Sequence, residues 1–192
     1  MSLISRGEAL KFVEEQIENK NIVKHMLALE ACMCALAREL KVAEADEAAW
    51  GLAGLLHDAD YTPDVPENEQ GIKVTEMLRE RGFEISEELA HAMAAHNAEN
   101  TGVQPESPMD WAIFCADSLT GLIVATALVR PDKKLASVEV KSVLKKFKSP
   151  SFASGTRRED IALCEEKLGL PLEKFVKICL TAMQGVSEEL EL

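Results

Sequence analysis

The sequence predicts an all-α fold, arranged as a single irregular helical bundle. Alanine, leucine, glutamate and lysine are abundant, and apolar residues recur at helical spacing along most of the chain. Aromatic residues make up only 5% of the sequence, and the alternating β-branched runs that indicate strands do not occur. The chain has 192 residues, which fits one domain, and 47% of them are hydrophobic, which is enough for a buried core.

Capping residues and helix breakers set the expected elements of the N-terminal half. Ser5, with Glu8 three residues later, resembles a capping box that opens the first helix. Asp46 is well placed near the start of the third helix, and Gly82 can end the fourth. The expected helices cover 5–17, 23–40, 45–57, 67–81 and 86–96, and the prolines of 60–66 predict a loop.

The C-terminal half is expected to continue the bundle. A long apolar helix is predicted over 109–129, because the helical pattern is unbroken there and Pro131 prevents its continuation. The stretches 100–108 and 148–156 contain Pro, Gly and Ser and are expected to be loops. Further helices are expected at 137–147, 157–168 and 171–189.

The charge of the chain argues against nucleic-acid binding but leaves binding of a small phosphorylated ligand open. The formal net charge of −12 argues against a general nucleic-acid binder. The stretch 130–158 departs from this balance, with nine Lys or Arg residues and two acids. Such a zone can bind a small phosphorylated ligand or can be a solvated helix face, and charge alone favours the solvated face.

Other bulk features predict a cytoplasmic protein with no membrane partner. The nearly apolar runs around 48–56 and 119–129 are shorter than the ~20 residues of a membrane span. No basic and then apolar leader precedes a cleavage site. The five cysteines are odd in number and lie in apolar, helical surroundings, so we expect free, buried thiols.

Several polar residues stand where helix packing favours apolar ones. Asp117 lies in a strongly apolar run, and burying it would require a cation or strong donors; a position at the bundle edge is the alternative. Gly121, one turn later on the same face, would let a backbone or a ligand approach. His57 and Asp58 end another apolar run, where an imidazole nitrogen and a carboxylate could bind one metal ion.

Two further histidines extend this set into an ordered series along the chain. His25 opens the second helix, where a capping or core role is the alternative to metal binding. His91 and His96 share the fifth helix but are five residues apart and face different directions, so at most one belongs to a common site.

The series resembles the HD-domain superfamily of metal-dependent phosphohydrolases, whose pattern is H…HD…D on separate helices of an all-α bundle. The local sequences 23–28, 51–58 and 114–117 carry the resemblance, and 120–131 and 141–148 are similar to a bacterial HDIG-type subfamily. The resemblance implies one domain over 1–192, with a metal core near 20–130 and a helical extension near 131–192. It also implies metal ligation by His25, His57, Asp58 and Asp117.

The number of metal ions depends on residues between the HD pair and the last Asp. Two-metal relatives carry two more histidines there; His96 matches the second, but Gln70 stands at the first position. Because Gln is a poor ligand for a transition metal, we expect one divalent ion, with a weaker second ion at His96 as the alternative. Manganese, iron, cobalt, nickel and zinc all fit the ligand types, and magnesium is a further option.

The resemblance implies a phosphohydrolase that acts on a nucleotide or another small phosphate ester through a metal-activated water. The candidate catalytic residues are Asp58, Asp60, Asp64, His96 and Asp117. The candidate substrate-binding residues are Gln70, Lys145, Lys146, Lys148, Arg157 and Arg158. The alternatives are a dinucleoside polyphosphate hydrolase or phosphodiesterase with a second metal, and a non-catalytic metal-containing signalling or binding module. The sequence leaves the oligomeric state open.

Overall fold

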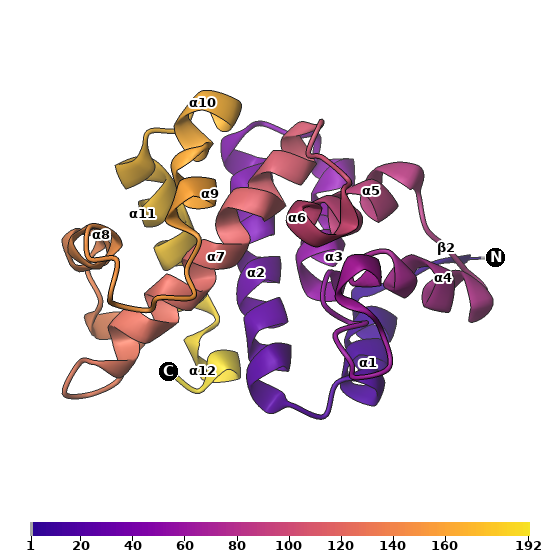
Figure 1. Cartoon of the computed structure of the whole chain (residues 1–192), viewed down its shortest axis with the longest axis horizontal. Helices are drawn as coiled ribbons and strands as arrows, with labels where there is room; N and C mark the ends of the chain where they lie inside the picture. Colours follow the sequence, from indigo (N-terminus) through magenta and orange to yellow (C-terminus); the bar gives the residue numbers. More distant parts are fainter. Residues whose placement is uncertain (1) are drawn as a thin grey trace.

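The protein is almost entirely helical, and the computed structural model describes residues 2–192 (Figure 1). This confirms the all-α prediction. The elements, in chain order, are β1 (Ser2–Leu3), α1 (Arg6–Gln16), α2 (Lys20–Glu39), α3 (Glu44–Leu56), η1 (Glu67–Glu69), α4 (Lys73–Glu80), β2 (Phe83–Glu84), α5 (Glu87–Ala95), α6 (Ala98–Thr101), α7 (Pro108–Leu128), η2 (Leu135–Ser137), α8 (Val140–Phe147), α9 (Arg158–Ala162), α10 (Cys164–Leu168), α11 (Leu172–Gly185) and α12 (Ser187–Leu190).

Helices α2, α3 and α7 form the frame that carries the polar residues of interest. Helices α2 and α3 approach closely, because Gly54 has no side chain: a Cβ there would lie 2.7 Å from backbone atoms of Leu29 and Glu30. Helix α7 packs against α2, α5 and α9. In Figure 1, α2 stands between the N-terminal helices α1, α3, α4 and α5 on one side and α8 to α11 on the other. The buried apolar side chains from Ile4 to Leu190 form one continuous core.

The local capping signals are confirmed, whereas the helix predicted over 67–81 is wrong in its first half. Ser5 and Glu8 form the capping box, and Gly82 has a φ of 88°. The chain from 67 makes only a 3-10 turn, and α4 begins at Lys73. Gly71 has a φ of 89°, a conformation that favours glycine and interrupts the helix.

The C-terminal half divides into shorter helices than predicted. The expected helix 157–168 forms α9 and α10, and the expected helix 171–189 forms α11 and α12. Of the expected helix 137–147, only α8 (Val140–Phe147) is an α-helix. The parallel pairing of β1 with β2 was not predicted, because strands of two residues have no detectable periodicity.

Helix α7 is long and apolar enough to cross a membrane by length and composition, although the apolar runs identified in the sequence were shorter than a span. Its apolar window is 61% buried inside the bundle, which is the position of a core helix. The cysteines of the described chain are all free; Cys34 is half-buried and the other four are buried.

Candidate metal centre

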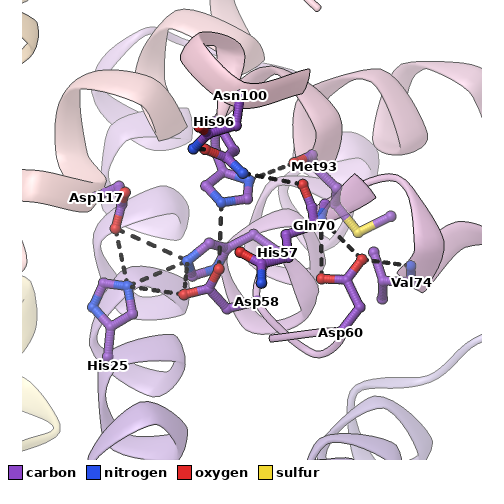
Figure 2. A network of polar contacts seen from close by, with 12 residues as sticks. His25, His57, Asp58, Asp60, Gln70, Val74, Met93, His96, Asn100 and Asp117 are labelled. Carbon is purple, nitrogen blue, oxygen red and sulfur yellow. Dashed lines mark hydrogen bonds and ion pairs between the residues drawn. The ribbon is translucent and has the colours of Figure 1, made fainter. Parts of the chain in front are cut away.

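Four helices bring the predicted polar residues to one place (Figure 2). His25 comes from the second turn of α2, and Asp117 from the middle of α7. His57 is the residue that ends α3, and Asp58 follows it. His96 ends α5 in the same way. Because a residue at a helix end is not restricted to one face of the helix, His57 and Asp58 can both point toward the other helices.

The side-chain atoms converge to within hydrogen-bonding or near-contact distance. The Nε2 atom of His25 lies 3.2 Å from Nε2 of His57 and 2.9 Å from Oδ1 of Asp117. Oδ2 of Asp58 lies 3.3 Å from Nε2 of His57 and 3.8 Å from Nε2 of His25. The ligand atoms of His25, His57 and Asp58 all lie within 4.8 Å of one another, a spacing that one ion can bridge. Asp117 extends this cluster, with its Oδ1 also 3.9 Å from His57.

Hydrogen bonds behind each imidazole fix its orientation. Nδ1 of His57 lies 2.9 Å from the Gly54 carbonyl oxygen and donates to it. Nδ1 of His25 lies 3.0 Å from the hydroxyl of Thr120, which in turn donates to the carbonyl of Asp117. With Nδ1 protonated in both rings, each neutral imidazole directs the lone pair of Nε2 toward the cluster. Such outer partners are typical of metal-binding histidines.

His96 joins the cluster from the other side of Asp58. Its Nδ1 donates to the Met93 carbonyl, and its Nε2 lies 3.3 Å from Oδ1 of Asp58. The two oxygens of Asp58 therefore face different histidines, His96 on one side and the His25–His57 pair on the other. His91 faces elsewhere and pairs with Asp110 at 2.9 Å, so only one of the two histidines of α5 takes part, as predicted.

The electrostatics of the cluster favour bound positive charge. Burial opposes ionisation of Asp58, but the charge and hydrogen bonds of His57 and His96 hold the pKa of this carboxyl well below its usual range. Burial likewise disfavours an imidazolium at His96, yet the hydrogen bond and charge of Asp58 raise its pKa to about 9. Against the same cost of burial, contact with Asp117 raises the pKa of His25. The carboxylates thus stabilise a positive charge, carried either by protons on the imidazoles or by a cation between them.

The donor set fits a divalent metal ion. The Nε2 lone pairs of His25 and His57 point at each other across 3.2 Å, an arrangement that repels unless a cation or a proton lies between them. Imidazole nitrogen together with carboxylate oxygen suits manganese, iron, cobalt, nickel or zinc. His25, His57 and Asp58 would hold the ion, with Asp117 as the fourth group.

Two of the predicted catalytic acids have other positions. Asp60 is fully buried, and its carboxylate accepts hydrogen bonds from the N–H groups of Gly71 and Val74. These bonds cap the start of α4 and indicate a structural role for Asp60, while its role as an acid or base stays a prediction. Asp64 is exposed in the loop before η1 and lines neither of the cavities beside the cluster that are described below.

Two cavities open beside the cluster, both bounded by Asp117 and Ser118. The polar cavity, of about 260 Å³, is lined by Asp58, Tyr61, Glu67, Gln70, His96, Asn97, Asn100, Asp117, Ser118, Arg157 and Asp160. The loop cavity, of about 410 Å³, is lined by His25, Asp117, Ser118, Gly121 and residues 153–156. Tyr61, Asn97, Asn100 and Asp160 were not identified from the sequence, because isolated polar residues in loops and short helices carry no motif.

The basic zone divides into residues that reach these cavities and residues that do not. Arg157 lines the polar cavity, where Glu99 at 2.7 Å and Asp160 at 2.6 Å hold its guanidinium. Arg158 instead donates to five backbone carbonyls, those of Phe147, Ser149, Phe152, Ala153 and Thr156. It shapes the loop 148–156 and has no free donors for a substrate, which corrects the prediction. Lys145, Lys146 and Lys148 line neither cavity, so their predicted contact with substrate is not supported.

Gln70 lies in the polar cavity beside His96, where a second histidine would complete a two-metal site. Its amide nitrogen donates one N–H to the Val65 carbonyl at 3.3 Å, which leaves the amide oxygen and the second N–H available to a ligand. Gln70 therefore remains a candidate for substrate contact.

Comparison with models of known protein families finds a match to the HD domain over residues 22–122, about half of the chain. The match includes His25, His57, Asp58, His96 and Asp117. No curated protein and no solved structure matches the chain.

Proposed function

The chain belongs to the HD-domain family, and from this premise we propose that it is a metal-dependent phosphohydrolase acting on a nucleotide or another small phosphate ester. One observation carries the proposal: His25, His57 and Asp58 place their ligand atoms within 4.8 Å of one another, beside cavities large enough for a small phosphorylated molecule. A helical bundle with only a structural role would gain no stability from bringing these groups together, because removing them from water costs free energy.

The residues around the cluster have distinct tasks in this mechanism. A bound divalent ion would supply the positive charge that polarises a phosphoryl oxygen and activates water. The Gly54 carbonyl and the Thr120 hydroxyl fix the orientations of His57 and His25, whose Nε2 atoms would hold this ion. Arg157, held between Glu99 and Asp160, presents a fixed guanidinium to non-reacting phosphoryl oxygens.

His96 is the best placed candidate for proton transfer. Among the candidate acids and bases, Asp60 is fully engaged by backbone N–H groups and Asp64 faces solvent. His96 lines the polar cavity and is held by the Met93 carbonyl, so its ring presents one nitrogen to the site. It could exchange a proton with the attacking water or with the leaving-group oxygen.

A second candidate, a two-metal phosphodiesterase or dinucleoside polyphosphate hydrolase, is favoured by one feature. Asp58 turns one oxygen to His96 and the other to the His25–His57 pair, as a carboxylate bridging two ions would. As a ligand of a second ion beside His96, Gln70 could offer only its amide oxygen, so we expect that ion to bind more weakly than the first.

The test combines metal analysis with turnover. Protein purified without chelator should contain about one divalent ion per chain, and with manganese or cobalt it should hydrolyse members of a panel of nucleotides. The double variant His57→Ala, Asp58→Ala should lose both properties. His91→Ala, which changes a histidine outside the cluster, should retain both.

The possible results separate the alternatives. Stoichiometric metal in the double variant would refute the ligand assignment. Stoichiometric metal in the unaltered protein without turnover on any nucleotide would favour the non-catalytic binding module. Product analysis would separate a monoesterase from a diesterase.

A further inference from the structure

One stripe along α7 joins the metal cluster to a third cavity that the proposed mechanism does not use. Asp117, Gly121, Val124 and Leu128 recur at intervals of three or four residues and therefore share a face of the helix. Asp117 borders the polar and loop cavities, Gly121 borders the loop cavity and the third cavity, and Val124 and Leu128 line the third cavity alone. From Asp117 to Leu128 the helix rises by about 16 Å. Neighbouring cavities along it share lining residues, Asp117 and Ser118 in one pair and His25 and Gly121 in the other, and we call this row of cavities the trough.

The third cavity is mainly apolar and has a volume of about 470 Å³. Its walls come from α2, α7, the end of α12 and the two residues after it, with Ala28, Val124, Leu128 and Leu190 among the apolar members. Leu128 is 48% exposed, so its apolar side chain is open to a ligand in this cavity. His25 borders this cavity as well as the loop cavity, so an apolar group bound here would lie next to the metal site.

The charge of the apolar cavity argues against a phosphate there. Lys24 is the one Lys or Arg among its described lining residues, and it forms an ion pair with Glu191. Asn21 adds an amide at the same rim. The apolar cavity therefore offers aliphatic walls with a few hydrogen-bonding groups at its edge, whereas the guanidinium of Arg157 is at the opposite end of the trough.

Gly121 lies between Asp117 and Val124 on the stripe of α7 and lines both the loop cavity and the apolar cavity. No heavy atom lies within 4 Å of the position that a Cβ would take at Gly121, so the space above it is open. A glycine inside a helix costs roughly 0.5–1 kcal/mol relative to alanine. A larger side chain at this position would project into the trough between His25 and Val124.

We propose that the apolar cavity binds a heteroaromatic ring, such as a nucleobase, of a substrate whose phosphate group lies at the metal cluster. The inference rests on the proposed function and specifies its substrate. The ring faces would contact Val124, Leu128 and Leu190, and the polar ring edge would reach Asn21 and the Lys24–Glu191 pair. An alkyl chain would leave these rim groups without partners, and a phosphate monoester without a large group would leave the cavity unfilled.

The test compares two hydrolysis-resistant ligands that differ only in the ring. Methylenephosphonate analogues of adenosine 5′-phosphate and of ribose 5-phosphate, in which a P–C bond replaces the ester P–O bond, are titrated into zinc-loaded protein by calorimetry. The adenosine analogue should bind at least about tenfold more tightly, because it buries a ring in the apolar cavity. Methyl signals of Val124 and Leu128 should shift with the adenosine analogue and remain in place with the ribose analogue.

Two variants that place a larger side chain in the apolar cavity test whether the preference for the adenosine analogue arises there. Gly121→Leu should bring the two affinities to within about threefold of each other while leaving zinc content unchanged. Val124→Phe narrows the apolar cavity from its wall and should also reduce the difference between the two affinities. Gly7→Leu is the matched control, because Gly7 is also helical and has no heavy atom within 4 Å of its Cβ position. It should bind both analogues as the unaltered protein does.

Each outcome decides between the inference and the proposed function. If neither analogue binds to the zinc-loaded protein, phosphate recognition at the cluster fails, and the proposed function fails with it. If both bind equally well, or if both filling variants leave the preference intact, the apolar cavity is not the ring site. Tighter binding of octylphosphonate than of the adenosine analogue would overturn the heteroaromatic assignment.

Discussion

Replacing Asp60 with alanine should destabilise the fold while preserving the metal cluster. The carboxylate of Asp60 is fully buried, 2.9 Å from the N atom of Gly71 and 2.8 Å from that of Val74. The substitution leaves both N–H groups buried without a partner, at about 1–3 kcal/mol each, so we expect a loss of roughly 2–6 kcal/mol. For a chain of this length, that corresponds to a fall in melting temperature of about 4–24 °C.

The assay is urea denaturation followed by circular dichroism, with metal content measured on the folded variant. Asp64→Ala is the matched control, since Asp64 is an exposed aspartate four residues away. It should change the free energy of unfolding by at most about 0.5 kcal/mol. A fully stable Asp60→Ala protein that has lost turnover would refute the structural role and favour Asp60 as an acid or base.

Three further predictions follow from packing and binding. Gly54→Ala should cost about 3 kcal/mol because its Cβ would meet the α2 backbone at 2.7 Å, whereas Gly121→Ala should be neutral or stabilise by about 0.5–1 kcal/mol; urea denaturation compares the two. Arg158→Met should increase hydrogen exchange within 147–156, whose carbonyls it holds, without changing metal content; unchanged exchange there would contradict the contacts. A divalent ion at 100 times its dissociation constant should raise the free energy of unfolding by about 2.7 kcal/mol, or the melting temperature by roughly 5–10 °C. His57→Ala should abolish this shift in calorimetry, and a shift of equal size in that variant would contradict the assignment.

The fold class could be predicted because the signals that define it are local. Helical periodicity, the Ser5–Glu8 capping box and the terminating Gly82 act within a few residues, and the structure confirms them. The start of α4 could not be predicted in this way. It depends on a hydrogen bond from Val74 to Asp60, which is 14 residues away in sequence.

The candidate site shows the same division between local and long-range information. The ordered series of histidines and aspartates identifies the cluster, because each member stands out against an apolar helix. Whether a basic residue can contact a ligand, by contrast, depends on its neighbours in the folded structure. Arg157 and Arg158 are adjacent, yet Arg157 lines the polar cavity, whereas Arg158 donates its hydrogen bonds to backbone carbonyls of the preceding loop.

Part of the lining of the three cavities comes from beyond the region that identifies the family. The family match ends at residue 122, whereas Arg157, which precedes α9, and Leu190, at the end of α12, come after it. The loop 153–156 also comes from this part, and the five backbone contacts of Arg158 shape it over the cluster. Under the proposed function, the metal ligands would all come from the family region, whereas residues after it would add to the substrate contacts, and α7 carries both Asp117 and the apolar stripe after it. Relatives that share the four ligands but differ after α7 should therefore share a metal centre and differ in the molecule they bind.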